Sequence, residues 1–317
     1  MKKFIGSAEL LLTAIIWGFA FVAQTAGTNV EPFTFNCLRS LIAAVFLCVV
    51  LALVKIIGKK KLITDGKAGL RRHIIGGVLC GAALFVATNV QQYGIYLYPS
   101  DAGASGRAGF LTALYVVFVP VVSALLFRRK IHPLIWCGVG ISLVGMYLIC
   151  FGAGIHNVYL GDIVMLASAA AFCAHILVID SVSGKTNGLV LSCIQFFTVS
   201  VLSFIGMLIF DHPSGSEIAS SVIPLLYLGI MSSGIAYTLQ ILGQKNTEPT
   251  LASIILSLES VFSVIGGWLI LHEHLKPREL IGCALVFSAI IIGQLPGIIA
   301  QKSRKNDEKT LDKEEKA

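Results

Sequence analysis

Charged residues are scarce in this sequence, and their scarcity indicates which solvent surrounds the chain. Lys, Arg, Asp and Glu make up 13% of the 317 residues, whereas 56% of the residues are hydrophobic. A typical soluble chain is about a quarter charged. So few charged side chains cannot cover the surface of a water-soluble fold of this size. We therefore expect an integral membrane protein whose main partner is the lipid bilayer.

The sequence also lacks the motifs of several common sites. Its eight cysteines lie within apolar runs and form no CxxC pair, which disfavours a disulfide framework or a zinc site. Neither an HExxH pattern nor a Walker A lysine motif is present. The net charge of +7 does not come from a basic helix with interleaved aromatic residues, so no nucleic-acid partner is expected. We expect no metal and no cofactor.

Apolar runs long enough to cross a bilayer as a helix, about 20 residues each, recur along the whole chain. The period-two alternation of a membrane β-barrel is absent, so each run must satisfy its backbone hydrogen bonds as a helix. Prolines such as Pro32 and Pro249 mark the ends of runs. The sequence predicts an all-α membrane protein with ten transmembrane helices. The predicted spans are 8–27, 33–54, 74–98, 108–127, 134–152, 160–180, 189–210, 222–243, 250–271 and 279–299.

Lys and Arg gather in alternate connections between these runs. If the N-terminus is cytoplasmic, about 20 of the 24 basic residues fall in cytoplasmic segments, and the loops 28–32, 153–159 and 211–221 contain none. This asymmetry is the positive-inside signal. It predicts a multi-pass protein of the cell membrane with both termini in the cytoplasm. The segment 301–317 has almost no apolar residues, so we expect a mobile cytoplasmic tail.

An internal repeat divides the chain. A shift of 144 residues places 105–145 over 249–289 without a gap. The identical pairs are Ala108/Ala252, Leu114/Leu258, Val117/Val261, Phe118/Phe262, Leu125/Leu269, Pro133/Pro277 and Gly138/Gly282. Five predicted helices separate the copies, and an odd number makes them cross the membrane in opposite directions. The sequence predicts two inverted five-helix repeats, 1–152 and 153–300, with a binding site between them near the membrane midplane.

The order and spacing of several short motifs carry a family resemblance. The motifs are Trp17-Gly18-Phe19, Glu31-Pro32-Phe33-Thr34-Phe35-Asn36 with Arg39, the run 105–117, Gly161-Asp162, and the run 249–259 from Pro249-Thr250 to Leu258-Glu259. The chain resembles the drug/metabolite transporter superfamily, in the branch built from two EamA-type repeats. The resemblance covers nearly the whole chain. It implies ten transmembrane helices and a small-molecule substrate.

Glu259 is the most prominent polar residue within a predicted span. An ionisable side chain inside the membrane is costly and is a functional candidate by default. Because burial favours the neutral form of a carboxyl group, this residue could exchange a proton or hold a cationic group. The alternative is a protonated glutamate that only joins two helices. Tyr115 aligns with Glu259 in the repeat and is expected to face the same cavity.

Polar and aromatic stripes complete the candidate substrate site. Asn89, Gln92 and Tyr93 share one face of the third span, and Tyr237 and Gln240 share a face of the eighth. Trp17 and Phe21 lie one turn apart on the first span. Each stripe could line a cavity that binds a polar ligand, or could join helices to each other.

Two further ionisable residues fall within predicted spans. His175 is a second candidate for proton coupling, although a lone histidine is more often a hydrogen-bonded core residue. Arg39 could attract an anion, pair with Asp101 or Glu259, or reach the membrane surface. Of these, a structural ion pair is the favoured interpretation.

The favoured function is a secondary transporter of small metabolites across the cytoplasmic membrane. We expect the substrate to be an amino acid or a related compound, the direction to be export, and protons to be a candidate coupling ion. The alternatives are a passive channel or a membrane sensor. An intramembrane enzyme is disfavoured because no convergent set of catalytic side chains lies within the spans. No pattern indicates the oligomeric state.

Overall fold

The computed structural model describes residues 2–58, 62–63, 66–99, 104–151, 159–271, 277–278, 280–293 and 295–296. Within these residues the regular structure is entirely helical, as the sequence predicts. Eight of the described helical segments are long and apolar enough to cross a membrane, and two shorter apolar helices, Pro133–Leu148 and Leu280–Gly293, accompany them. The chain is thus a multi-pass helical membrane protein. The predicted tail, 301–317, lies outside the described residues.

The helix ends follow the local sequence. Proline opens α2, α6 and α12, where its missing N–H is not needed by the first turn. At the start of α8 the Asn187 side chain accepts hydrogen bonds from the N–H groups of Leu189 and Val190. The helices are α1 (Lys2–Ala26), α2 (Pro32–Gly58), α3 (Gly66–Tyr96), α4 (Ala104–Ala113), α5 (Tyr115–Leu125), α6 (Pro133–Phe151), α7 (Leu160–Ser183), α8 (Gly188–Phe210), α9 (Gly215–Ser220), α10 (Val222–Leu226), the π-helix η1 (Tyr227–Ala236), α11 (Tyr237–Gln244), α12 (Pro249–Leu256) and α13 (Glu259–Leu271).

Two spans that the sequence predicts as continuous are interrupted, one between α4 and α5 and one between α12 and α13. In the first gap the N–H of Leu114 bonds the carbonyl of Leu111 at 3.3 Å, and in the second the N–H of Leu258 bonds the carbonyl of Ile255 at 3.2 Å. These bonds reach three residues back, so both helices tighten locally. Leu114 and Leu258 are matched positions of the sequence repeat, and the two halves therefore share the same interruption.

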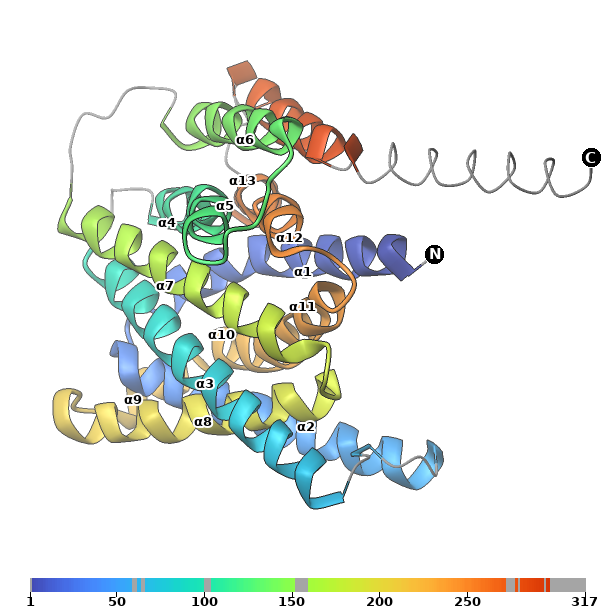
Figure 1. The fold of residues 1–317 in the computed structure, drawn as a ribbon. Helices are drawn as coiled ribbons and strands as arrows, with labels where there is room; N and C mark the ends of the chain where they lie inside the picture. The colour runs from blue at the N-terminus through green and yellow to red at the C-terminus, as the bar shows by residue number, and fades with distance from the viewer. Residues whose placement is uncertain are drawn as a thin grey trace, which may run out of the picture.

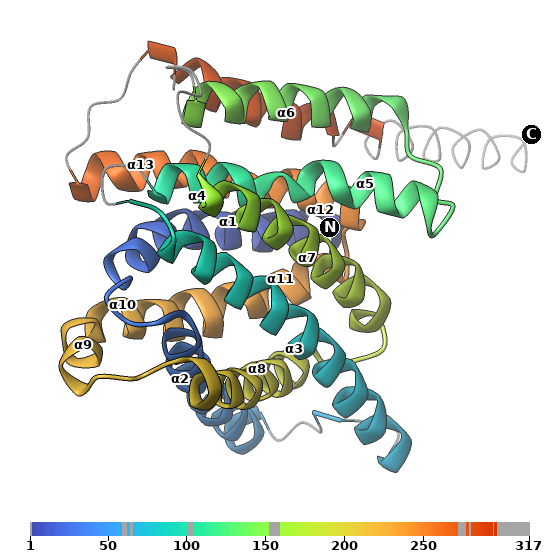
Figure 2. The same cartoon turned by 90° about the vertical axis from the view of Figure 1, so that its left-hand side faces the viewer.

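Helices of the two halves are interlocked. Figures 1 and 2 show α6 and the helix 280–293 along one edge of the bundle and α2 with α8 at the opposite edge. Between these edges, α1 packs against η1, α11 and α13, whereas α7 packs against α3, α4 and α5. The first helix of each half therefore makes its main contacts with the other half.

Two arginines, Arg107 within α4 and Arg129 after the end of α5, hold α7 at its two ends. At the start of α7, Asp162 forms an ion pair with Arg107 at 2.9 Å and accepts a hydrogen bond from Tyr98 Oη at 2.7 Å. Near its end, Asp180 pairs with Arg129 at 2.6 Å. The side chains of the first pair are 12% and 11% exposed, and those of the second are 42% and 20% exposed. The first pair is therefore much better shielded from solvent.

Candidate functional site

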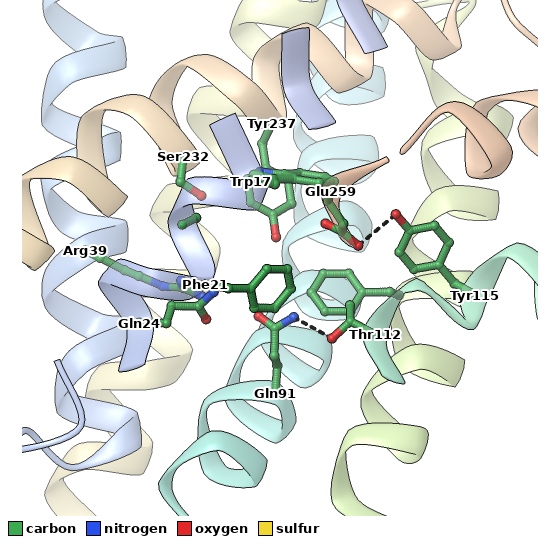
Figure 3. A pocket seen from close by; sticks show the side chains of 12 residues that line it. Trp17, Phe21, Gln24, Arg39, Gln91, Thr112, Tyr115, Ser232, Tyr237 and Glu259 are labelled. Carbon is green, nitrogen blue, oxygen red and sulfur yellow. Dashed lines mark hydrogen bonds between the residues drawn. The ribbon is translucent and has the colours of Figure 1, made fainter. Parts of the chain in front are cut away.

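A cavity lined by helices from both halves of the chain contains the two helix interruptions in its wall. Its volume is about 20 Å³, enough for a single water molecule. Figure 3 shows the side chains that surround it. The lining residues are Trp17, Ala20, Phe21, Gln24, Arg39, Gln91, Thr112, Tyr115, Phe172, Ser232, Tyr237 and Glu259.

The two interruptions each bring one polar side chain to this cavity. Tyr115 is the first residue of α5, Glu259 is the first residue of α13, and both are buried. The Tyr115 hydroxyl donates a hydrogen bond to Glu259 Oε1 at 2.9 Å, as Figure 3 shows. Among the described residues the other carboxyl oxygen has no hydrogen-bond partner. One side of the Glu259 carboxyl group is thus held by the protein, and the other side remains available.

Aromatic rings form much of the cavity wall. The rings of Trp17 and Tyr237 lie 4.5 Å apart between centroids, with 55° between their planes. Phe21 and Phe172 also line the space. The Trp17 Nε1–H has no hydrogen-bond partner within the described part of the chain. Flat rings next to a free indole donor can hold a partly apolar ligand and orient one of its acceptors.

The opposite side of the cavity carries a positive charge. In Figure 3, Arg39 and Gln24 lie on one side of Phe21, and Glu259 lies on the other. Arg39 is only 4% exposed, and no carboxylate among the described residues lies within 4.0 Å of its guanidinium group. The sequence favours a structural ion pair of Arg39 with Asp101 or Glu259. The pair with Glu259 is not formed, so that part of the prediction is wrong. The other predicted partner, Asp101, lies outside the described residues.

The structure places two of the predicted site residues in a different groove. Asn89 and Tyr93 line a space of about 560 Å³ together with Glu31 and Asp211. Asn89 is already engaged, because its side chain donates to Ser203 Oγ and accepts from Asn36 Nδ2, both at 3.1 Å. Burial, opposed in part by hydrogen bonds to the backbone and hydroxyl of its neighbours, raises the pKa of Asp211. A role for Asn89 and Tyr93 in substrate binding stays a prediction.

Three other candidate residues are buried but do not line the cavity. Gln92 and Gln240 are at most 1% exposed, and each has a side-chain atom without a hydrogen-bond partner among the described residues. His175 Nε2 lies 3.1 Å from Gln195 Oε1 and must donate to it, because an amide oxygen can only accept. The His175 ring also meets the edge of the Tyr237 ring at 5.9 Å. His175 thus lies one residue away from the cavity, and its part in proton coupling stays a prediction.

Sequence reasoning missed several residues of the cavity. Gln91 and Thr112 line it and are joined by a hydrogen bond of 3.1 Å from Gln91 Nε2 to Thr112 Oγ1. Helical spacing groups Asn89, Gln92 and Tyr93 on one face of α3 without showing where that face points. Gln91, next to Gln92 in sequence, lies on the face of α3 that lines the cavity. Phe172 and Ser232 also line the cavity, but neither belongs to a polar stripe at helical spacing, so the sequence carries no signal for them.

This chain is similar in sequence and in fold to several known proteins. Residues 5–151 and 159–293 each match the EamA-like transporter family. An uncharacterized transporter of Archaeoglobus fulgidus is 30% identical over 296 residues, which cover 93% of this chain and 87% of that protein. The uncharacterized transporter YoaV of Bacillus subtilis is 25% identical over 302 residues, covering 89% of this chain and 94% of that protein. A solved crystal structure with 20% identity aligns at a TM-score of 0.70 over 93% of this chain and 98% of its own, which shows the fold alone.

Proposed function

Because the chain belongs to the EamA-like transporter family, we propose that it is a secondary transporter of small metabolites in the cell membrane. In this proposal the eight long helical segments and the two shorter apolar helices make ten spans. Residues 1–152 and 153–300 are two five-helix repeats of inverted orientation, and both termini are cytoplasmic. Discontinuous helices from such repeats commonly form the substrate site of secondary transporters.

The observation that carries this proposal is the pair of matched interruptions. Tyr115 and Glu259 occupy equivalent positions of the two repeats, and their side chains meet at one cavity with a hydrogen bond between them. A site shared by two repeats can be exposed to either side of the membrane when one repeat moves against the other. The matched positions therefore support alternating access, with the substrate bound between the halves.

The finer parts of the proposal concern the substrate and the driving ion. We propose that the protein exports an amino acid or a related compound in exchange for protons, and that Glu259 is the residue that takes up the proton. A buried carboxyl group is readily protonated and deprotonated as its surroundings open and close. His175, in edge contact with Tyr237, is the second candidate for the proton path.

The volume of the cavity indicates the conformational state. With room for about one water molecule, it cannot hold an amino acid, so the helices must separate before a substrate binds. A wider cleft of about 750 Å³ lies where α5, α7 and α11 end, and its lining includes Arg129, Asp180 and Gln244. We propose that this cleft is the cytoplasmic entrance to the closed site.

The test compares metabolites inside and outside cells that produce the intact protein, Glu259→Gln or Glu217→Gln at equal membrane levels. Glu217 is an exposed residue of α9 and serves as the matched control. We expect the intact protein and Glu217→Gln to redistribute one class of compound, and we expect Glu259→Gln to lose at least about 90% of this effect because its side chain cannot ionise.

Reconstituted protein then separates a carrier from a channel. A carrier shows saturable counterflow of the compound that the cell experiment identifies, and an imposed pH gradient drives its accumulation. Linear flux without counterflow would indicate a passive channel instead. If Glu259→Gln redistributes metabolites as the intact protein does, Glu259 is structural and the coupling residue must lie elsewhere.

A further inference from the structure

Arg39 is a buried charge whose counter-ion is missing from the described chain. Its side chain is 4% exposed and lines the central cavity. No Asp or Glu of the described residues reaches it, although Arg107 and Arg129 each have an aspartate partner. A guanidinium group taken out of water without an anion is strongly destabilising. An anion that arrives with the ligand would supply the charge that no described side chain provides.

A second polar group at the same end of the cavity is also unsatisfied. Gln24 is 4% exposed, and its Oε1 accepts no hydrogen bond from the described residues. Figure 3 shows this side chain beside the end of the Arg39 side chain. Buried polar atoms of folded proteins are nearly always paired with protein, water or ligand. Arg39 offers donors and Gln24 Oε1 needs a donor, so the anion is assigned to Arg39 alone and Gln24 marks this end of the cavity as polar.

We propose that Arg39 binds the carboxylate of the transported substrate while Glu259, across Phe21, binds its ammonium group. The free oxygen of Glu259 and the unpaired guanidinium group of Arg39 are the only oppositely charged groups that line the described cavity. The substrate class is thus a zwitterion that carries one carboxylate and one amine. This assignment rests on the proposed transport function, and it adds a role for Arg39.

The charged side chains that line the described cavity favour a carboxylate over a phosphate ester as the anion that binds Arg39. A single arginine is the only basic side chain in the described lining. A phosphate ester would bring close to two negative charges at neutral pH, and Glu259 would repel it further. One planar guanidinium group matches one planar carboxylate by two parallel hydrogen bonds.

The same geometry explains how a proton gradient could drive export. The substrate's ammonium group and a proton would occupy the same Glu259 oxygen, so that each excludes the other. Binding of a proton to Glu259 from outside the cell would release the zwitterion there. Release of that proton into the cytoplasm would allow the next zwitterion to bind from the cytoplasmic side. Arg39 remains charged throughout and gives affinity only to molecules with a carboxylate.

Ligand binding to the purified full-length protein in detergent tests this assignment without any transport. The shift of the thermal unfolding midpoint is measured with each proteinogenic amino acid, with its carboxamide, with its N-acetyl derivative and with sodium chloride. We expect at least one amino acid to stabilise the protein while its carboxamide and N-acetyl derivative bind about tenfold to a hundredfold more weakly. In Arg39→Gln the difference between the amino acid and its carboxamide should fall to less than about threefold.

Two further variants separate this role from general damage. Arg39→Lys keeps the charge and should retain part of the preference for the carboxylate. Arg107→Gln removes another shielded arginine, outside the cavity, and should leave the preference unchanged while it lowers the starting midpoint.

The wild-type protein alone can overturn the proposal, even if Arg39→Gln does not fold. Equal stabilisation by an amino acid and its carboxamide, no stabilisation by any amino acid, or an equal effect of chloride would show that Arg39 does not read a substrate carboxylate. Discrimination in this assay without counterflow in vesicles would contradict the transport proposal and leave the Arg39 assignment standing. Counterflow of a compound that lacks a carboxylate would support the transport proposal and contradict the Arg39 assignment.

Discussion

The hydrogen bond between Tyr115 and Glu259 joins two side chains that have no other described partner. Tyr115→Phe removes the only hydrogen-bond donor to the Glu259 carboxyl group among the described residues. We expect the rate of substrate counterflow to fall roughly tenfold, since a hydrogen bond to a charged group contributes about 1.5–3 kcal/mol. The matched control is Tyr227→Phe. The Tyr227 hydroxyl donates a 3.0 Å hydrogen bond to the Ile16 carbonyl, and Tyr227 does not line the cavity. We expect Tyr227→Phe to lower the thermal midpoint but to transport normally per folded molecule. Equal losses of counterflow in both variants would contradict this.

At the level of single residues, the internal repeat predicts which residues share a cavity. The sequence alone does not predict which way a helix face or a buried charge is oriented. Alignment of Tyr115 with Glu259 predicted that both face one cavity, and the two side chains do line it. For Arg39 the sequence shows that a charge lies within a span but not which charges are near it, so the expected ion pair with Glu259 is not found. For α3, the direction of the inward face depends on how the helix packs, and Gln91 was missed for that reason.

At the level of elements, α7 is held at two ends by ion pairs of unequal burial. We expect Asp162→Asn to lower the free energy of unfolding by about 3 kcal/mol, because it removes the negative charge that pairs with Arg107 in a shielded place. Asp180→Asn breaks the more exposed pair and should cost at most about 1 kcal/mol. Denaturant unfolding in mixed micelles measures both. Similar losses for the two variants would mean that shielding does not set the strength of these pairs.

The hydrophobic runs predict the helices, but they do not predict the interruptions between α4 and α5 and between α12 and α13. No glycine or proline stands at Leu114 or at Ser257-Leu258, so the apolar runs continue through both gaps. The π-helix η1 is equally invisible, because it lies within an ordinary apolar run. Such features depend on which neighbouring groups satisfy a few backbone hydrogen bonds, and a single sequence does not record those neighbours.

At the level of the whole molecule, the direction of α6 distinguishes ten spans from eight. In a variant with all native cysteines replaced by serine, His132→Cys and Leu160→Cys place one thiol on either side of α6. Ten spans predict that a membrane-impermeant thiol reagent labels Leu160→Cys in intact cells and His132→Cys only after permeabilisation. Ser216→Cys in α9 is the outer reference. Labelling of both test positions from the same side would show that α6 does not cross the membrane.

The interlocked packing of the two halves has a consequence for the origin of such a chain. Because α1 packs on the second half and α7 on the first, neither half can cover its own packing surface. The bond between Tyr115 and Glu259 likewise needs one residue from each half. If the two repeats are inverted, as proposed above, a shorter ancestor that encoded a single repeat would have built this site by inserting into the membrane in both orientations and pairing the two forms. Gene duplication would then have fixed one orientation for each copy and allowed the two matched positions to become different residues.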